Sequence, residues 1–140
     1  GTLPAGQLVK LCFSGQYTEA QIRRMLCGSG GLVSLAGSNS VQELLERAKQ
    51  GDRACERIIY AMAYNVAKEI GAMAAVLGGR VDAILITGGI AYSGTVCDAI
   101  RERVSFIAPV EVIPGEDEMG ALAENALRVL RGEEMPKKYE

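Results

Sequence analysis

Residues 82–94, "DAILITGGIAYSG", carry an apolar run that leads directly into two glycines. Residues 83–87 contain no charged side chain, which is typical of a central parallel strand that is buried on both faces. The two glycines leave bare backbone at the carboxyl end of that strand, where open parallel sheets bind their ligands. A helix is expected to begin next, at Ser93 or Gly94. The stretch therefore predicts a strand, a ligand-facing turn and a helix in succession.

A second strand is expected at residues 110–113, beyond the helix that ends near Arg103. Because a helix connects them, the two strands are predicted to be parallel neighbours with a right-handed crossover. The longest helix is expected to begin after Asp52 and to reach Leu77, with apolar residues recurring at helical spacing. The fold class is therefore α/β, with a short parallel sheet flanked by helices and several extra helices on the N-terminal side.

Capping residues mark the shorter helices. We expect helices to begin after Pro4, Thr18 and Ser40, because proline suits a first turn and the other two residues suit an N-cap. Gln21 and Glu43 stand three residues after the two N-caps, which completes the capping-box pattern.

Glycines and charges mark the remaining segments. Residues 28–40, "GSGGLVSLAGSNS", read as a loop that holds a small strand at residues 32–35. A final helix is expected after Gly115, with acids in its first turn and arginines in its last, followed by a polar tail at residues 133–140. The whole chain, residues 1–140, is predicted to form one domain.

Composition excludes several classes of function. A net charge of −2 gives no electrostatic case for nucleic acid or an anionic membrane, and no apolar run is long enough to cross a bilayer, so a soluble cytoplasmic protein is expected. The absence of histidine makes a zinc site improbable and removes the commonest general base. The cysteines have no C-x-x-C spacing and are expected to be reduced thiols buried in helices: Cys12, Cys27, Cys55 and Cys97.

Two strands alone would leave backbone groups of the sheet without partners. Either further strands come from elsewhere, or the chain is a fragment of a longer one. The apolar stripe of the long helix, over residues 58–77, is also too broad for one neighbouring element to cover. Such a patch predicts a homo-oligomer, with a dimer expected.

Two motifs could carry chemistry. Gly88 and Gly89 could bring backbone amides against a nucleotide, or they could form a tight turn and nothing more. The acids Glu116, Asp117 and Glu118 follow the second strand at the same sheet edge and could hold Mg²⁺. They could equally be the favourable charges of a helix first turn.

Three segments together resemble the C-terminal part of the bacterial butyrate kinases: residues 30–40, "GGLVSLAGSNS"; residues 61–93, "AMAYNVAKEIGAMAAVLGGRVDAILITGGIAYS"; and residues 103–134, "RVSFIAPVEVIPGEDEMGALAENALRVLRGEE". These enzymes belong to the acetokinase family, within the actin-like, sugar-kinase and Hsp70-like ATPases. The resemblance implies a partial ribonuclease H-like domain. It also implies transfer of the ATP γ-phosphoryl group to butyrate, which gives an acyl phosphate and ADP, with Mg²⁺ and in a homodimer.

The resemblance also implies site residues. Residues 87–93 would be the adenosine motif, and residues 38–42 a second stretch in contact with the nucleotide. Acetate kinases carry Asp-x-Arg where this chain has Ser40-Val41-Gln42, and Tyr92 could pack on the nucleotide instead. The metal-linked glutamate would be Glu118, with Glu116 and Asp117 as alternatives. The implied nucleotide-binding residues are Thr87, Gly88, Gly89, Ile90, Ala91, Tyr92, Ser93, Ser38, Asn39, Ser40 and Gln42.

The family's catalytic arginines and histidine lie upstream of the matching segments, so we expect no catalytic residue here and an inactive isolated fragment. Two other interpretations stay open. The chain could be a non-catalytic nucleotide-binding or oligomerisation module, or part of an acetate or branched-chain acyl kinase, since the acyl pocket lies mainly upstream.

Overall fold

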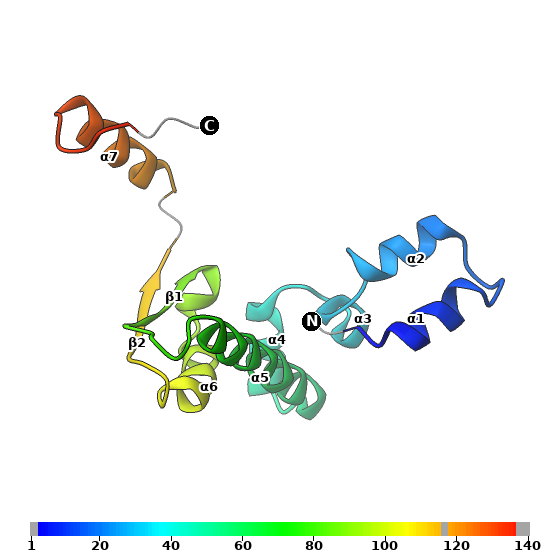
Figure 1. The fold of residues 1–140 in the computed structure, drawn as a ribbon. Coiled ribbons are helices and arrows are strands. Elements are labelled where there is room, and N and C mark those ends of the chain that lie inside the picture. The colour runs from blue at the N-terminus through cyan, green and yellow to red at the C-terminus, as the bar shows by residue number, and fades with distance from the viewer. Residues whose placement is uncertain (1–2, 116–117, 137–140) are drawn as a thin grey trace.

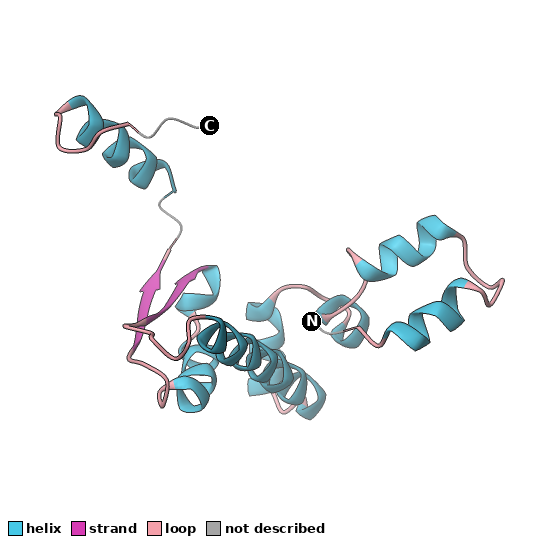
Figure 2. Ribbon diagram, viewed as in Figure 1, coloured by secondary structure: helices cyan, strands magenta, loops and turns pink. Residues whose placement is uncertain are grey.

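The computed structural model describes residues 3–115 and 118–136, and its sheet consists of two parallel strands (Figure 2). Strand β1 (Ile84–Gly88) pairs with β2 (Val110–Pro114) in a register that runs from Ile84 opposite Val110 to Gly88 opposite Pro114. Helix α6 (Gly94–Val104) lies between them in the chain. The prediction of adjacent parallel strands joined by a helix is confirmed.

The core lies on one face of this sheet. Ile84 and Ile86 of β1 are buried, and they belong to the same apolar cluster as the buried face of α6 and the middle of α5 (Arg53–Val76). Leu85 points to the other face and is 61% exposed. Burial on both faces, predicted from the apolar run, is therefore wrong for the described residues, because they form a helical layer on one side only.

The long helix α5 begins where the sequence predicts. The Asp52 carboxylate caps it and accepts hydrogen bonds from the backbone N–H groups of Ala54 and Cys55, at 3.0 and 3.1 Å. Helix α5 is fastened to α6 by Arg103, whose guanidinium stacks over the rings of Tyr60 and Tyr64 at 4.7 and 5.4 Å from their centres. Such cation–π contacts attract the guanidinium to the ring faces and so help to hold the two helices together.

From residue 3 onward, where the described structure begins, four helices precede α5: α1 (Ala5–Cys12), α2 (Glu19–Leu26), α3 (Leu32–Ala36) and α4 (Val41–Lys49). The capping box at Thr18 is confirmed, with both reciprocal bonds to Gln21. The strand predicted at residues 32–35 is wrong, because those residues form α3 between Gly31 and a left-handed Gly37. Helices α1 and α2 extend from the body as an arm (Figure 1).

Helix α7 (Glu118–Leu130) follows the sheet and lies apart from the other helices (Figure 1). Its apolar side chains Met119, Leu122 and Leu130 are exposed. Arg128 is in its last turn, as predicted, and pairs with Glu134 of the tail at 2.6 Å.

All four cysteines are free thiols, as predicted. Cys55 and Cys97 are buried, but Cys12 and Cys27 are exposed, and Cys27 is the C-cap residue of α2 rather than a helical one. The two-helix arm is too thin to enclose them. Among the described helices, none is both long and apolar enough to cross a membrane.

Candidate nucleotide-binding site

The glycine turn closes β1 with a backbone conformation that only glycine adopts easily. Gly88 has φ +77° and ψ −167°, and its N–H donates to the Gly115 carbonyl at 3.2 Å. A single 3₁₀ turn, η1 (Gly89–Tyr92), follows. A Cβ atom added to Gly89 would meet no other atom within 4 Å. Gly88 therefore shapes the turn, whereas Gly89 leaves open space where a side chain would otherwise stand.

The start of α6 supports this turn from behind. The Ser93 hydroxyl caps α6 by accepting a hydrogen bond from the Val96 N–H at 3.3 Å. The buried thiol of Cys97 lies 3.8 Å from the carbonyl oxygens of Ile90 and Ala91. The turn is thus anchored to a packed helix, which gives its outer surface a fixed shape.

A cavity of about 660 Å³ lies between this turn and helix α4. It joins two segments that are far apart in the sequence, and both were predicted to contact a nucleotide. The predicted residues that line it are Ser40, Gln42, Gly89, Ile90, Tyr92 and Ser93.

Five predicted residues do not line the cavity. The Ser38 hydroxyl donates to Glu43 at 2.6 Å and accepts from the Ser40 N–H at 3.2 Å, so it shapes the loop before α4. Ala91 is buried beneath the turn and Thr87 pairs with Ile113 inside the sheet. The other two are Gly88, which forms the turn, and Asn39, which is exposed.

The sequence prediction missed further lining residues. On α4 they follow helical spacing, because Gln42, Leu45 and Lys49 stand three and four residues apart on one face. That periodicity was the available signal. Lys49 pairs with Glu46 at 2.7 Å, so both charges at this wall are balanced. The lining residues outside the predicted stretches are Leu45, Glu46, Lys49, Gly94 and Thr95, and Val41 lies within the predicted stretch of residues 38–42.

The chemistry of the lining suits a flat heterocycle with polar edges. Leu45 and Ile90 offer apolar surface, while the Gln42 amide offers both a donor and an acceptor. Tyr92 is 73% exposed, so its ring is available to a ligand. Concave sites that combine apolar walls with a few polar groups are the usual form of small-molecule sites.

The predicted metal site falls mostly outside the described residues. Glu116 and Asp117 are not among them, and Glu118 begins α7 without a described side chain. Within residues 3–115 and 118–136, no group of three histidine, cysteine, aspartate or glutamate side chains could hold a metal ion. The hydrogen bond between Gly88 and Gly115 nevertheless brings the chain to the glycine turn just before the three acids.

A larger cavity, of about 960 Å³, runs along the apolar stripe of α5. Met62, Ile70 and Met73 line it, together with Leu32 of α3 and Ile84 of β1. The described chain leaves the C-terminal part of this stripe exposed, since Met73 and Leu77 are 55% and 53% exposed, whereas Met62 and Ile70 are partly buried against the core. The oligomer that the stripe suggests stays a prediction.

Comparisons of the sequence and the structure with known proteins point to one group of enzymes. Residues 6–113 match the model of the acetokinase family. A probable butyrate kinase from Clostridium botulinum (strain Alaska E43 / Type E3) is 50% identical over 139 residues, which cover 99% of this chain and 39% of that protein. The chain thus spans well under half the length of that relative.

Two solved structures share the fold. The crystal structure of Porphyromonas gingivalis acetate kinase superposes with a TM-score of 0.79 at 21% identity, covering 93% of this chain and 39% of that one. A propionate kinase from Francisella tularensis subsp. tularensis SCHU S4 gives a TM-score of 0.68 at 20% identity, covering 84% of this chain and 36% of that one. Both confirm the predicted fold class, with a short parallel sheet flanked by helices.

Proposed function

Because the chain belongs to the acetokinase family, we propose that it forms the adenosine-binding part of a butyrate kinase. The reaction is transfer of the γ-phosphoryl group of ATP to butyrate, which yields an acyl phosphate and ADP. The choice of butyrate rests on the 50% identity with a probable butyrate kinase. Identities near 20% with the acetate and propionate kinases support the fold alone.

One observation carries the proposal, namely that the cavity joins the two predicted nucleotide stretches. The adenine would lie between α4 and the glycine turn, against the bare backbone of Gly89. The Gln42 amide would bond the polar edge of the base, and Tyr92 would pack on the nucleotide. The first residues of α6, Gly94 and Thr95, extend the same wall.

The proposed site also includes a magnesium ion next to the nucleotide. Three consecutive carboxylates, Glu116, Asp117 and Glu118, supply the oxygen ligands that Mg²⁺ prefers, directly or through its waters. We favour Glu118 as the metal-linked residue. The ion would neutralise phosphate charge, which is the main electrostatic requirement of phosphoryl transfer.

The chain's role in this reaction is binding rather than proton transfer. It has no histidine, and the residues that line the cavity include no unpaired acid or base, because Lys49 and Glu46 neutralise each other. We assign the catalytic arginines and histidine of the family to sequence outside this chain.

We also propose a homodimer in the cytoplasm. The apolar stripe of α5 is the surface that a second subunit would cover, since exposed patches of this kind mark association sites. Light scattering of the full-length protein should give twice the monomer mass, and replacing Met73 by lysine should lower it. A monomeric mass at high concentration would contradict the dimer.

The test of the activity uses the full-length protein with acetate, propionate, butyrate and isobutyrate. Acyl phosphate formation should depend on ATP and Mg²⁺ and be fastest with butyrate, and calorimetry should detect ADP binding. A protein that binds ADP but phosphorylates none of the acids would be a nucleotide-binding module. A protein that binds no ADP would refute the proposal as a whole.

A further inference from the structure

Helix α4 has two faces with different tasks. Gln42, Leu45 and Lys49 line the nucleotide cavity, whereas Leu44 is fully buried in the core and Arg47 faces the ends of the neighbouring helices. The helix has nine residues. Helices of fewer than roughly 12 residues are marginal alone, so contacts with the rest of the fold determine where α4 lies.

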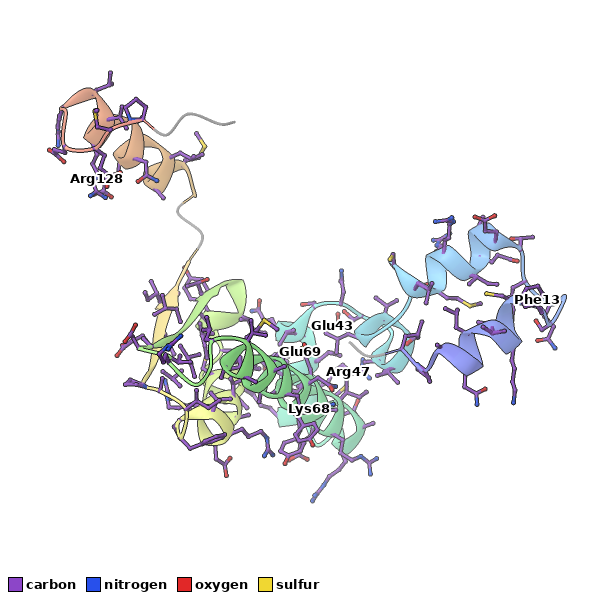
Figure 3. The ribbon with its side chains drawn as sticks, in the orientation of Figure 1. Phe13, Glu43, Arg47, Lys68, Glu69 and Arg128 are labelled. Carbon is purple, nitrogen blue, oxygen red and sulfur yellow. The ribbon has the colours of Figure 1, made fainter. Side chains whose placement is uncertain are left out.

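Arg47 makes the longest-range polar contacts of this helix. Its Nη1 donates to the Ala36 carbonyl at the end of α3, at 2.9 Å. Its Nε and Nη2 donate to the Asp52 carboxylate at the start of α5, at 3.2 and 2.9 Å. Glu43, one turn earlier, lies 4.0 Å from the same guanidinium and beside it in Figure 3. One side chain therefore ties three helix ends together.

The Asp52 carboxylate is a fixed anchor for this arginine. One oxygen caps α5 through two backbone N–H groups, and the other also accepts from the buried Cys55 thiol at 3.2 Å. The Cys55 backbone and thiol, followed by Arg47, lower the pKa of Asp52 to about 2. The hydrogen bond to Asp52 in turn raises the pKa of Arg47. The pair is thus ionised throughout the neutral range.

We propose that Arg47 is a positioning residue for the nucleotide site: its bridge from Ala36 to Asp52 holds α4 at the distance from the glycine turn that the ligand requires. The inference rests on the proposed function, because it assigns this cavity to the nucleotide. Arg47 is not among the lining residues of the cavity, so it acts through the helix that carries Gln42, Leu45 and Lys49.

The test measures binding and kinetics of Arg47→Met in the full-length protein. The Kd for ADP and the KM for ATP should both rise roughly 3- to 30-fold, while kcat at saturating ATP and the KM for butyrate stay unchanged. Arg47→Lys should restore part of the affinity, because lysine can reach Asp52 but cannot also bond the Ala36 carbonyl through a planar fork. Asp52→Asn keeps an N-cap oxygen but removes the charge, and it should act in the same direction.

A matched control separates positioning from general stability. Arg103→Met removes another guanidinium that joins two helices, through Tyr60 and Tyr64, and Arg103 does not line the cavity. It should lower the Tm and leave the Kd for ADP at the wild-type value. An Arg47→Met protein with an unchanged Kd for ADP would overturn the inference. So would an Arg103→Met protein in which the Kd for ADP rises, per degree of Tm lost, as much as it does in Arg47→Met.

The same series distinguishes failure of the inference from failure of the proposed function. If Gly89→Val weakens ADP binding and Arg47→Met does not, the site stands and the positioning role is refuted. If neither variant affects ADP binding, or if the wild-type protein binds no ADP, both proposals fail.

Discussion

Replacing Gly89 with valine places three carbon atoms where the proposed site needs bare backbone. Gly89 lines the cavity of about 660 Å³, and a Cβ atom built on it meets nothing within 4 Å. Its φ angle is not in the left-handed region, so a branched residue can adopt the native backbone there. The structure therefore predicts a small effect on folding and a steric effect on the ligand.

The size of the steric effect follows from what overpacking costs. Added methyl groups in a well-packed site cost about 1–3 kcal/mol. If the base contacts the Gly89 backbone, the Kd for ADP should rise roughly 5- to 150-fold, since every 1.4 kcal/mol is a factor of about ten. Gly89→Ala adds one carbon and should give a smaller increase. The stability change should stay below about 1 kcal/mol, because losing a glycine also reduces the entropy of the unfolded chain.

Calorimetry with ADP measures the affinity, and urea denaturation measures the stability. Gly6→Val is the matched control, because a Cβ atom at Gly6 of α1 also meets nothing within 4 Å and Gly6 does not line the cavity. The control should bind ADP as the wild type does. A folded Gly89→Val protein with the wild-type Kd would refute the assignment of this turn to the nucleotide.

Three further predictions concern the metal, a helix cap and the core. Glu118→Gln should lower turnover and raise the Mg²⁺ requirement with the Kd for ADP unchanged; a coupled acyl-phosphate assay across Mg²⁺ concentrations checks this, and an unaltered requirement contradicts it. The pKa of Asp52 is lowered from 3.8 to about 2, so its ionised form stabilises the fold above about pH 4 and the contribution is lost as the pH falls toward 2. The stability difference between wild type and Asp52→Asn, measured in urea, should therefore shrink over that interval, and a constant difference argues against it. Leu44→Ala should cost about 2–5 kcal/mol of unfolding free energy, because Leu44 has 0% exposure; a loss below about 1 kcal/mol would contradict the packing.

Local sequence patterns predicted where helices begin better than they predicted how each element packs against the rest of the fold. Thr18, Ser40 and Asp52 cap helices where the sequence indicates, because a capping hydrogen bond involves only neighbouring residues. The strand predicted at residues 32–35 was wrong, since a short apolar run fits a strand or a helix equally well. No strand of the described residues pairs with this segment, which forms α3. The exposure of Leu85 could not be predicted, because burial depends on which layers pack against the sheet.

In the candidate site, too, the sequence predicted the two segments that line the cavity but not the contacts of several individual side chains. Its two stretches were predicted from a family resemblance, and the structure brings Ser40 and Gln42 together with Gly89 and Tyr92. The sequence does not reveal that the Ser38 hydroxyl donates a hydrogen bond to Glu43 rather than facing the cavity. The direction of this side chain depends on how the loop enters α4. Lys49 was missed because the nucleotide-contacting stretch that the resemblance implied ends at Gln42, before the rest of this helix.

The two-stranded sheet has a practical consequence for handling this stretch of polypeptide. Within the described residues, β1 and β2 pair only with each other, and Leu85 and Ile113 are exposed on one face. Each strand thus keeps an outer edge whose N–H and C=O groups can template hydrogen bonding with another molecule. Expressed by itself, the stretch has the features of a segment that aggregates through strand pairing between molecules, so a lysine in place of the exposed Leu85 should raise its solubility.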